Sequence, residues 1–290
     1  MALPLKPAAI VGVVNSLRKT SDKPLLVAGG LADVLAREFA AGGDPSAVRT
    51  GGAPQNVEAL VYVIGDTVTE QDEKVLKAAH RARVPTVVVA AGREAPARIP
   101  FVPATDVVRV PTGSGFPVEE ITRVLMHKLG EEGSSLARRL PVLRRAFCSE
   151  LIESFARKNG LLAVAVFVPG ADLPVLTLNQ LRMVLRICAA YGLDVDAQRA
   201  PEILATVGAG LGFRALAREV LGAIPVAGWL AKGAIAYAGT KALGEAAVRY
   251  CEARTGASST SAVSDASHRV SGGAQAAAKP QPGAISPSSS

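Results

Sequence analysis

Aromatic residues are scarce in this chain, and their scarcity restricts its fold class. Phe, Trp and Tyr together make up 4% of the 290 residues, whereas hydrophobic residues as a whole reach 49%. Ala, Val and Leu therefore carry most of the apolar content. Such residues pack closely between helices and parallel strands, so the composition disfavours a β-sandwich. The length allows two modest domains.

Cysteine and histidine are also rare, and neither forms a pattern typical of a metal or catalytic site. Cys148, Cys188 and Cys251 include no C-x-x-C pair and have no histidine at metal-ligand spacing. We therefore expect no metal site and no disulfide framework, but three small core residues in a protein of the reducing cytoplasm. No Ser-His-Asp or Cys-His spacing is present, so the sequence predicts no catalytic residues and disfavours an enzyme.

Long apolar runs are missing as well. A helix that crosses a membrane needs about 20 predominantly apolar residues, and the longest uncharged stretch of this chain is the 13 residues between Lys158 and Asp172. Two interpretations stay open: buried core helices, which we favour, or a re-entrant or interfacial hairpin associated with a membrane. The first apolar run, 7-PAAIVGVV-14, predicts an amphipathic helix rather than a signal peptide.

Positive charge is in excess but is hardly concentrated anywhere. Lys and Arg number 32 against 25 Asp and Glu, and the only dense basic run is 138-RRLPVLRR-145. Nucleic-acid binders usually interleave such runs with aromatic residues, and none occurs here before Phe147. We expect no nucleic-acid partner, and we interpret the run as a solvated helix face or a surface near anionic lipid.

The N-terminal part, residues 1–129, alternates short aliphatic runs with helical stretches. Strands that are apolar on both faces and are separated by helices predict a doubly wound, mostly parallel sheet. Thr69 is the expected N-cap of one helix, with Asp72 and Glu73 in its first turn. The expected strands are 25–28, 59–65, 86–91 and 106–110, and the expected helices are 30–40, 69–82 and 117–129.

After residue 129 the composition and the periodicity of the chain change. Residues 130–253 contain no convincing strand pattern and are rich in Ala, Gly and Leu, which predicts an all-α domain. Residues 254–290 are rich in Ser, Ala, Gly and Pro and have few apolar anchors, which predicts a disordered tail. The helices expected in the all-α domain are 143–158, 160–168, 177–191, 200–222 and 227–252.

A Gly-Gly pair after the first strand raises the question of nucleotide binding, because phosphates bind at the following helix N-terminus. The order of elements resembles a small GTPase-type domain, but no G-K-[ST] occurs in the chain and 90-AAGRE-94 stands where Asn-Lys-x-Asp is expected. Asp33 would repel a phosphate. We expect a nucleotide-dead domain without a cofactor. The weak candidates for a ligand crevice are Gly29, Gly30, Asp66, Gly92 and Gly113.

One helix of the all-α domain carries several local signals. The stretch 177-TLNQ-180 fits a capping box in which Thr177 is the N-cap and Gln180 bonds back to it. Gly192 is a natural stop for this helix. Asp172 lies just before the helix, and we expect it to fix a turn or to pair with Arg182 or Arg186.

Three stretches resemble the domain of unknown function 697, the YcjF-like family: 168-VPGADLPVLTLNQLRMVLRICAAYG-192, 211-LGFRALAREVLGAIPVAGW-229 and 237-YAGTKALGEAAVRY-250. The resemblance covers roughly residues 145–252. It implies a helical module that is often attached to a GTPase domain and that in some members belongs to bacterial inner-membrane proteins. It implies no reaction. The expected signature residues are Pro169, Gly170, Asp172, Pro174, Thr177, Gln180, Arg182, Arg186, Gly192, Arg214, Pro225, Gly228, Trp229, Gly239, Thr240 and Gly244.

Three functions are compatible with these patterns. The first is a non-enzymatic interaction or scaffold protein, in which a nucleotide-dead GTPase-like domain presents the helical module to a protein partner, a membrane surface or a second copy of the chain. The second is an integral or re-entrant membrane protein of the YcjF-like type. The third is a sensor that binds a small ligand or nucleotide in the crevice of the sheet.

Overall fold

The computed structural model describes residues 7–18, 21–94, 96–110, 113–165, 173–194, 196, 203, 205–207 and 228–276. The chain forms two compact units, Met1–Cys251 and Glu252–Ser290. The first unit holds a parallel sheet and the helices that follow it, so the predicted fold class of a parallel α/β part followed by a helical part is confirmed.

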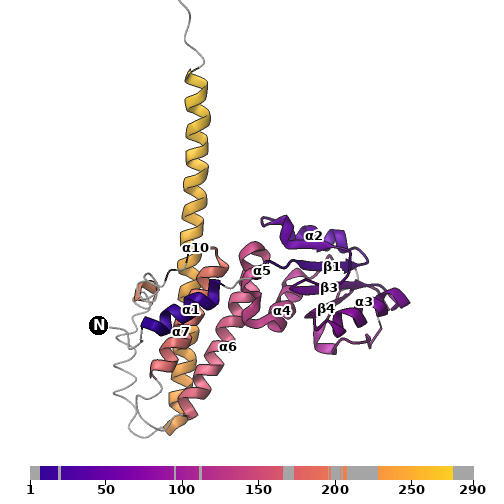
Figure 1. The fold of residues 1–290 in the computed structure, drawn as a ribbon, viewed down its shortest axis with the longest axis horizontal. Coiled ribbons are helices and arrows are strands. Elements are labelled where there is room, and N and C mark those ends of the chain that lie inside the picture. The colour runs from indigo at the N-terminus through magenta and orange to yellow at the C-terminus, as the bar shows by residue number, and fades with distance from the viewer. Residues whose placement is uncertain are drawn as a thin grey trace, which may run out of the picture. The chain divides into compact units, whose positions relative to one another are not determined.

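Five parallel strands form one sheet in the order β2-β1-β3-β4-β5 (Figure 1). Strand β2 lies on one side of β1, and the chain then crosses over so that β3 lies on the opposite side of β1. This reversal creates a switch point between β1 and β3, where open α/β sheets usually bind their ligands. The strands are β1 (Leu25–Gly29), β2 (Val48–Thr50), β3 (Ala59–Ile64), β4 (Thr86–Ala90) and β5 (Val107–Arg109).

Helices cover both faces of the sheet. On one face, α2 (Ala32–Ala40) and α4 (Val118–Leu129) bury their apolar sides against alternate strand residues such as Val61. On the other face, α3 (Glu70–Arg81) packs against residues such as Leu60. The central strands are therefore apolar on both sides, as a parallel sheet requires.

Local signals predicted this part of the chain well. Thr69 caps α3 as expected, and its capping box with Asp72 also includes the hydroxyl of Tyr62, which donates to Asp72 Oδ1 at 2.7 Å. Burial would raise the pKa of the Asp72 carboxyl, but bonds from Thr69 and Tyr62 hold it below its ordinary value. Strand β2 was not expected, because its three residues at the sheet edge show no apolar run.

The helical part consists of α5 (Ser134–Arg139), α6 (Arg144–Ala165), α7 (Leu173–Ala190) and α10 (Gly228–Ala276). The two helices expected at 143–158 and 160–168 are wrong, because α6 runs through both. Asn159 is fully buried and bonded to a neighbouring helix, so it does not end α6.

The first and the last elements of the described chain are both helices. The expected first helix is α1 (Pro7–Arg18), which packs against α7, with Val13 and Val14 buried in the shared core. Helix α10 continues to Ala276, into the segment for which disorder is predicted; the rest of that segment lies outside the described residues. Its last part belongs to the second compact unit.

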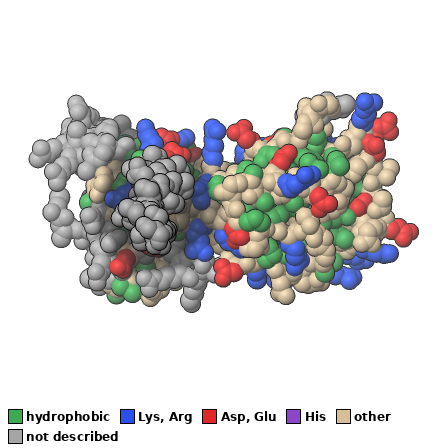
Figure 2. Space-filling model, turned by 90° about the horizontal axis from the view of Figure 1, so that it is seen from above, with side chains coloured by type: hydrophobic (Ala, Val, Ile, Leu, Met, Phe, Trp, Pro, Cys, Tyr) green, Lys and Arg blue, Asp and Glu red, His purple; other side chains and the backbone are tan. Residues whose placement is uncertain are grey.

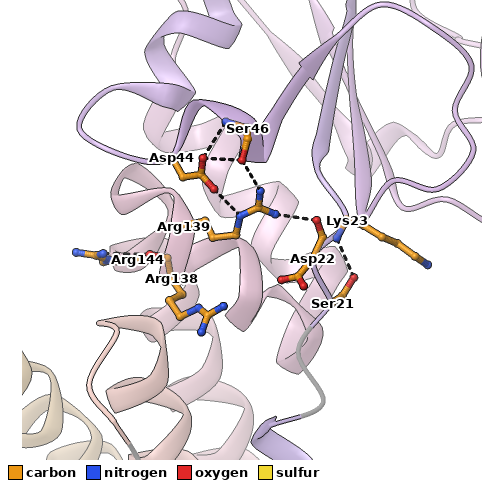
Figure 3. A network of polar contacts seen from close by, with 8 residues as sticks. All are labelled: Ser21, Asp22, Lys23, Asp44, Ser46, Arg138, Arg139 and Arg144. Atoms are coloured by element: carbon orange, nitrogen blue, oxygen red, sulfur yellow. Dashed lines mark hydrogen bonds and ion pairs between the residues drawn. The ribbon is translucent and has the colours of Figure 1, made fainter.

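Arg139 joins the helical part to the sheet part (Figure 3). Its guanidinium donates to Asp44 Oδ2 at 2.9 Å, to the carbonyl oxygen of Asp22 at 2.9 Å and to Ser46 Oγ at 3.2 Å. The backbone N–H of Asp44 donates in return to the carbonyl oxygen of Arg139 at 2.9 Å. Gly43 lies so close that an added Cβ would be 2.6 Å from that oxygen. We call this contact the joint.

Candidate functional site

The corner at the carboxyl ends of β1 and β3 is the place where a nucleotide phosphate is expected. Gly29 has φ +94°, and a Cβ there would lie 2.0 Å from the carbonyl oxygen of Val63, so only glycine fits. The N–H of Gly30 donates to the same oxygen at 3.0 Å. Leu31 then opens α2 with φ 58° and without a side-chain cap. The turn between β1 and α2 is thus closed by a bond to β3.

Asp66 and Gly92 meet beside this corner. A Cβ on Gly92 would lie 2.4 Å from both the backbone nitrogen and the Oδ1 atom of Asp66. The same Oδ1 accepts a hydrogen bond from the N–H of Glu94 at 3.0 Å, which ties the loop after β3 to the loop after β4. Gly113 lies exposed in the loop before α4 with φ +81°. Of the five crevice candidates, Gly29 and Gly92 therefore occupy tight backbone corners, and Gly30 and Asp66 form hydrogen bonds beside them.

A second polar site lies inside the helical part. Asn159 of α6 donates through Nδ2 to Thr240 Oγ1 of α10 at 3.0 Å, and its Oδ1 accepts from Asn179 Nδ2 of α7 at 2.9 Å. Gln180 Nε2 also reaches Thr240 Oγ1, at 3.4 Å, and this hydroxyl donates to the carbonyl oxygen of Ala236 at 2.7 Å. We call Asn159, Asn179, Gln180 and Thr240 the polar cluster. Because Asn159 and Thr240 are fully buried, these bonds fix the register of three helices.

The capping box expected at 177-TLNQ-180 is wrong. Helix α7 already includes Leu173, so Thr177 lies in the helix interior and Gln180 turns to α10 instead. Pro174 explains the earlier start, since proline is well tolerated in the first turn of a helix. The expected stop is confirmed: Gly192 has φ 74°, its N–H donates to Ala189, and the N–H of Leu193 donates to Cys188.

Arg186 pairs with Glu131, while its expected alternative partner Asp172 lies outside the described residues. The Nη1 atom of Arg186 lies 2.7 Å from Glu131 Oε2 and also donates to the backbone oxygen of Glu131, in the 3-10 helix Gly130–Gly133. Lys158 of α6 binds the same carboxylate at 3.0 Å. Burial lowers the pKa of the Arg186 guanidinium, and Glu131 opposes the shift. The neighbouring signature residue Arg182 is exposed.

Glycines bring α6 and α10 into close contact. A Cβ on Gly244 would lie 2.5 Å from Ile152 Cγ1, and one on Gly233 would lie 2.5 Å from Val164 Cγ2 and 3.0 Å from the carbonyl oxygen of Gly160. Gly244 is therefore a packing residue of this crossing. The signature residue Gly239 is half-buried on the same helix.

Several expected signature residues cannot be placed in this site. Gly228, Trp229 and Pro174 begin α10 and α7, and the structure describes their backbone but not their side chains. The others, Pro169, Gly170, Asp172, Arg214 and Pro225, lie outside the described residues.

No sequence pattern predicted the roles of Asn159, Asn179 or Glu131. Asn159 stands between a lysine and a glycine, a context typical of a helix end, so a role in the core was not apparent. Asn179 lay inside the expected capping box. For the two asparagines, the only available signal was an amide beside an apolar run.

Arginines of the basic run 138–145 form contacts within the protein. Arg139 forms the joint, and Arg144 Nη2 donates to the carbonyl oxygen of Arg138 at 3.2 Å (Figure 3). Arg144 also lies over the ring of Tyr191, with Cζ 5.5 Å from the ring centroid, and its Nε donates to the carbonyl oxygen of Ala137. Arg145 pairs with Glu119, and Arg138 is exposed. Figure 2 shows basic and acidic side chains interspersed over the described part of one face.

A groove with a volume of about 690 Å³ lies between α4 and α6 and shares no lining residue with the corner. Its charged residues are of both signs, and His127 Nδ1 lies 3.1 Å from Glu150 Oε2. Among the residues that the structure describes, no group of three or more His, Cys, Asp or Glu side chains is placed to hold a metal ion.

A scan against protein-family models matched residues 127–275, just over half of the chain, to the domain of unknown function DUF697. The chain belongs to this family. The matched segment begins in α4 and contains the whole polar cluster, Arg186, Glu131 and the α6–α10 glycines. Searches of the curated proteins and of the solved structures each found no match.

The DUF697 assignment supports the family resemblance of the helical part and carries no reaction with it. Within the described part of the chain, no helix is both long and apolar enough to cross a membrane.

Proposed function

We propose that this DUF697 protein is a non-enzymatic interaction protein, in which a nucleotide-dead GTPase-like domain carries the helical domain and the helical domain binds a protein partner. The observation that carries this proposal is the corner between β1 and β3. Its Gly30 N–H, which would face a phosphate, is already bonded to Val63. The GTPase-like origin of the sheet part stays a prediction from the order of its elements.

Electrostatics at the corner also disfavour a phosphate. The first turn of α2 carries Asp33 and no basic residue, so the favourable field of the helix N-terminus is opposed by a carboxylate. The cation of α2, Arg37, lies in the last turn of the helix. Its Nε donates to the backbone oxygen of Asp33, one turn earlier. An anionic ligand would therefore find the Gly30 amide already bonded and no neutralising charge in the first turn of α2.

The helical domain offers apolar side chains at one end. Leu161 of α6, Val175 of α7 and Ile235 of α10 are 71%, 46% and 40% exposed. The Gly160–Gly233 contact and the Asn159–Asn179 bond bring their three helix ends together. Exposed branched aliphatic side chains at one helix-bundle end suit a partner with an apolar surface.

The charges near this end favour a protein over an anionic membrane. Arg157 pairs with Glu153 at 3.2 Å, and both Lys158 and Arg186 pair with Glu131. Attraction to anionic lipid depends on several uncompensated cations, and two carboxylates offset most of the charge of these three. A protein surface needs no such excess.

Nucleotide binding is tested by calorimetry of the purified full chain with GTP and with ATP, each with and without Mg²⁺. We expect no binding heat with either nucleotide, and an active small GTPase measured in parallel provides the positive control. Tight, Mg²⁺-dependent binding of GTP or ATP would contradict a nucleotide-dead domain.

The partner surface is tested by Leu161→Glu, with Val34→Glu on α2 as the control because Val34 is also exposed, at 39%. We expect a partner captured in cells by photo-crosslinking to be lost with Leu161→Glu and retained with Val34→Glu. Flotation of the chain with vesicles containing anionic phospholipid, abolished by Leu161→Glu, would overturn the proposal in favour of a membrane surface.

A further inference from the structure

Two of the three cysteines touch each other in the helical domain. The thiol of Cys251 on α10 donates to the sulfur of Cys188 on α7, with 3.5 Å between the two sulfur atoms. Both side chains are fully buried, and neither is in a disulfide. Sequence spacing gave no sign of this pair, because 63 residues separate the two positions.

The pairing follows from the register of the helices. The bond from Gln180 to Thr240 shows that α7 and α10 lie side by side, with sequence numbers offset by about the same amount as in the cysteine pair. A disulfide bond is about 2.05 Å long, so the two sulfurs need to approach by roughly 1.5 Å. Rotation about the two Cα–Cβ bonds and a small shift of the helices supply a movement of this size.

The pair also lies where local unfolding of a helix end can expose the sulfur atoms. Cys188 is two residues from the end of α7 at Ala190, and it covers Cys251, which lies within α10. Helix ends open locally at a lower free-energy cost than the centre of a fold. Small oxidants can reach these sulfurs through such opening, although both are buried in the closed state.

We propose that Cys188 and Cys251 form an oxidation site that takes hydrogen peroxide as its substrate and closes to an intramolecular disulfide. One thiolate attacks a peroxide oxygen, the O–O bond breaks, and the products are a sulfenic acid and water after protonation. The second thiol loses its proton and attacks the sulfenic sulfur, which forms the S–S bond and releases a second water. In total, two thiols are oxidised and one peroxide is reduced to two water molecules.

The disulfide would link the end of α7 to α10 and close a loop that contains all residues between them. A cross-link over a loop of this length restricts the unfolded chain and thereby stabilises the folded one. The polar cluster already holds the same helices in register at Thr240, so oxidation adds a second, covalent tie further along them. The helical domain would thus be more rigid in oxidising conditions.

The test treats the full chain with hydrogen peroxide under native conditions. Expected results are the loss of two hydrogens from the intact mass, a fall from three to one in the thiols that react after denaturation, and a peptide pair linked through Cys188 and Cys251. The midpoint of thermal unfolding rises, and dithiothreitol reverses the change.

Single variants separate this pair from other oxidation. Cys148→Ala removes the third cysteine, a buried residue of α6, and is expected to leave disulfide formation intact. Cys188→Ala and Cys251→Ala are expected to abolish it. Circular dichroism establishes that each variant is folded.

The proposal is overturned if the wild-type chain gains only oxygen atoms, if the linked peptides contain Cys148, or if its mass and thiol count stay unchanged. Because these results are read on the wild-type chain, they decide the question even if an alanine variant fails to fold. They are also independent of nucleotide and partner binding.

Discussion

The hydroxyl of Thr240 accepts hydrogen bonds from α6 and from α7 and donates one within its own helix. A hydroxyl is the smallest side-chain group that can do both at once. Two amide groups therefore depend on one oxygen atom in the middle of the helical domain. A family member that keeps Asn159 without a hydroxyl at position 240 would bury an amide with one bond fewer.

Thr240→Val tests this dependence, because it keeps the shape of the side chain and removes the oxygen. We expect the free energy of unfolding to fall by about 1–3 kcal/mol, the usual cost of a buried polar group that loses its partner. The measurement is urea denaturation followed by circular dichroism.

Thr240→Ser is the matched control, since it retains the hydroxyl and loses only a methyl group. We expect a clearly smaller loss for it. Equal unfolding midpoints for the valine and serine variants would show that the polar cluster does not contribute to stability.

At the scale of elements, α10 depends on two glycines for its contact with α6. Gly233 and Gly244 place its backbone where larger side chains would meet Val164 and Ile152. These positions and Thr240 lie along one buried side of the helix, together with Leu243, Ala247 and Cys251. The side is defined by small residues, and so the crossing is sensitive to added volume.

Gly244→Ala is expected to reduce the free energy of unfolding by about 1–3 kcal/mol, because overpacking outweighs the better helix propensity of alanine. Gly256→Ala on the same helix has no atom within 4 Å of the added Cβ and is the control. We expect it to be neutral or slightly stabilising. Thermal unfolding of both variants compares the two, and an equal effect would contradict the tight crossing.

A comparison of predicted and observed elements shows which of them the sequence pattern could predict. Strands β1, β3 and β4 are apolar on both faces and are bounded by turn residues, so their periodicity sufficed to predict them. The start of α7 was mispredicted because a capping box is a local motif, and the preference of Pro174 for a first turn competes with it.

The polar cluster could not be predicted from the sequence, for a different reason. Its residues come from three helices, and their contacts depend on how those helices pack. Periodicity identifies the apolar side of each helix but contains no information on the register between helices. Asn159, Asn179 and the cysteine pair could be recognised as partners only in the folded structure.

At the scale of the whole molecule, the joint links the sheet part to the helical part through several hydrogen bonds of one side chain. Arg139 is 14% exposed and serves three acceptors, two of them on the 3-10 helix segment after α2. The pKa of Asp44 is lowered from its ordinary value of 3.8, chiefly by hydrogen bonds from Ser46 and then from Arg139. The joint therefore favours the charged carboxylate.

Arg139→Ala is expected to lower the midpoint of thermal unfolding and to speed proteolysis near Asp22 and Asp44. The adjacent Arg138→Ala is the control, since Arg138 is exposed. Because the folded pKa of Asp44 lies below 3.8, its contribution is present above that pH and is lost as the pH falls through the lower, folded value.

The difference between Arg139→Ala and wild type should thus shrink in acid. Unfolding midpoints measured from pH 7 to below pH 3.8 check this. A difference that stays constant over the range would show that the joint acts through packing and not through the ion pair.

The packing of α1 against α7 has a consequence for the order of events during synthesis. The first helix leaves the ribosome before the sheet, but its partner is made only after the sheet and the first helices of the DUF697 segment. At roughly 5–20 residues per second, α1 waits for about ten seconds or more with Val13 and Val14 uncovered. The nascent chain thus exposes the apolar side of α1 throughout that interval, which makes α1 a natural point of contact for chaperones.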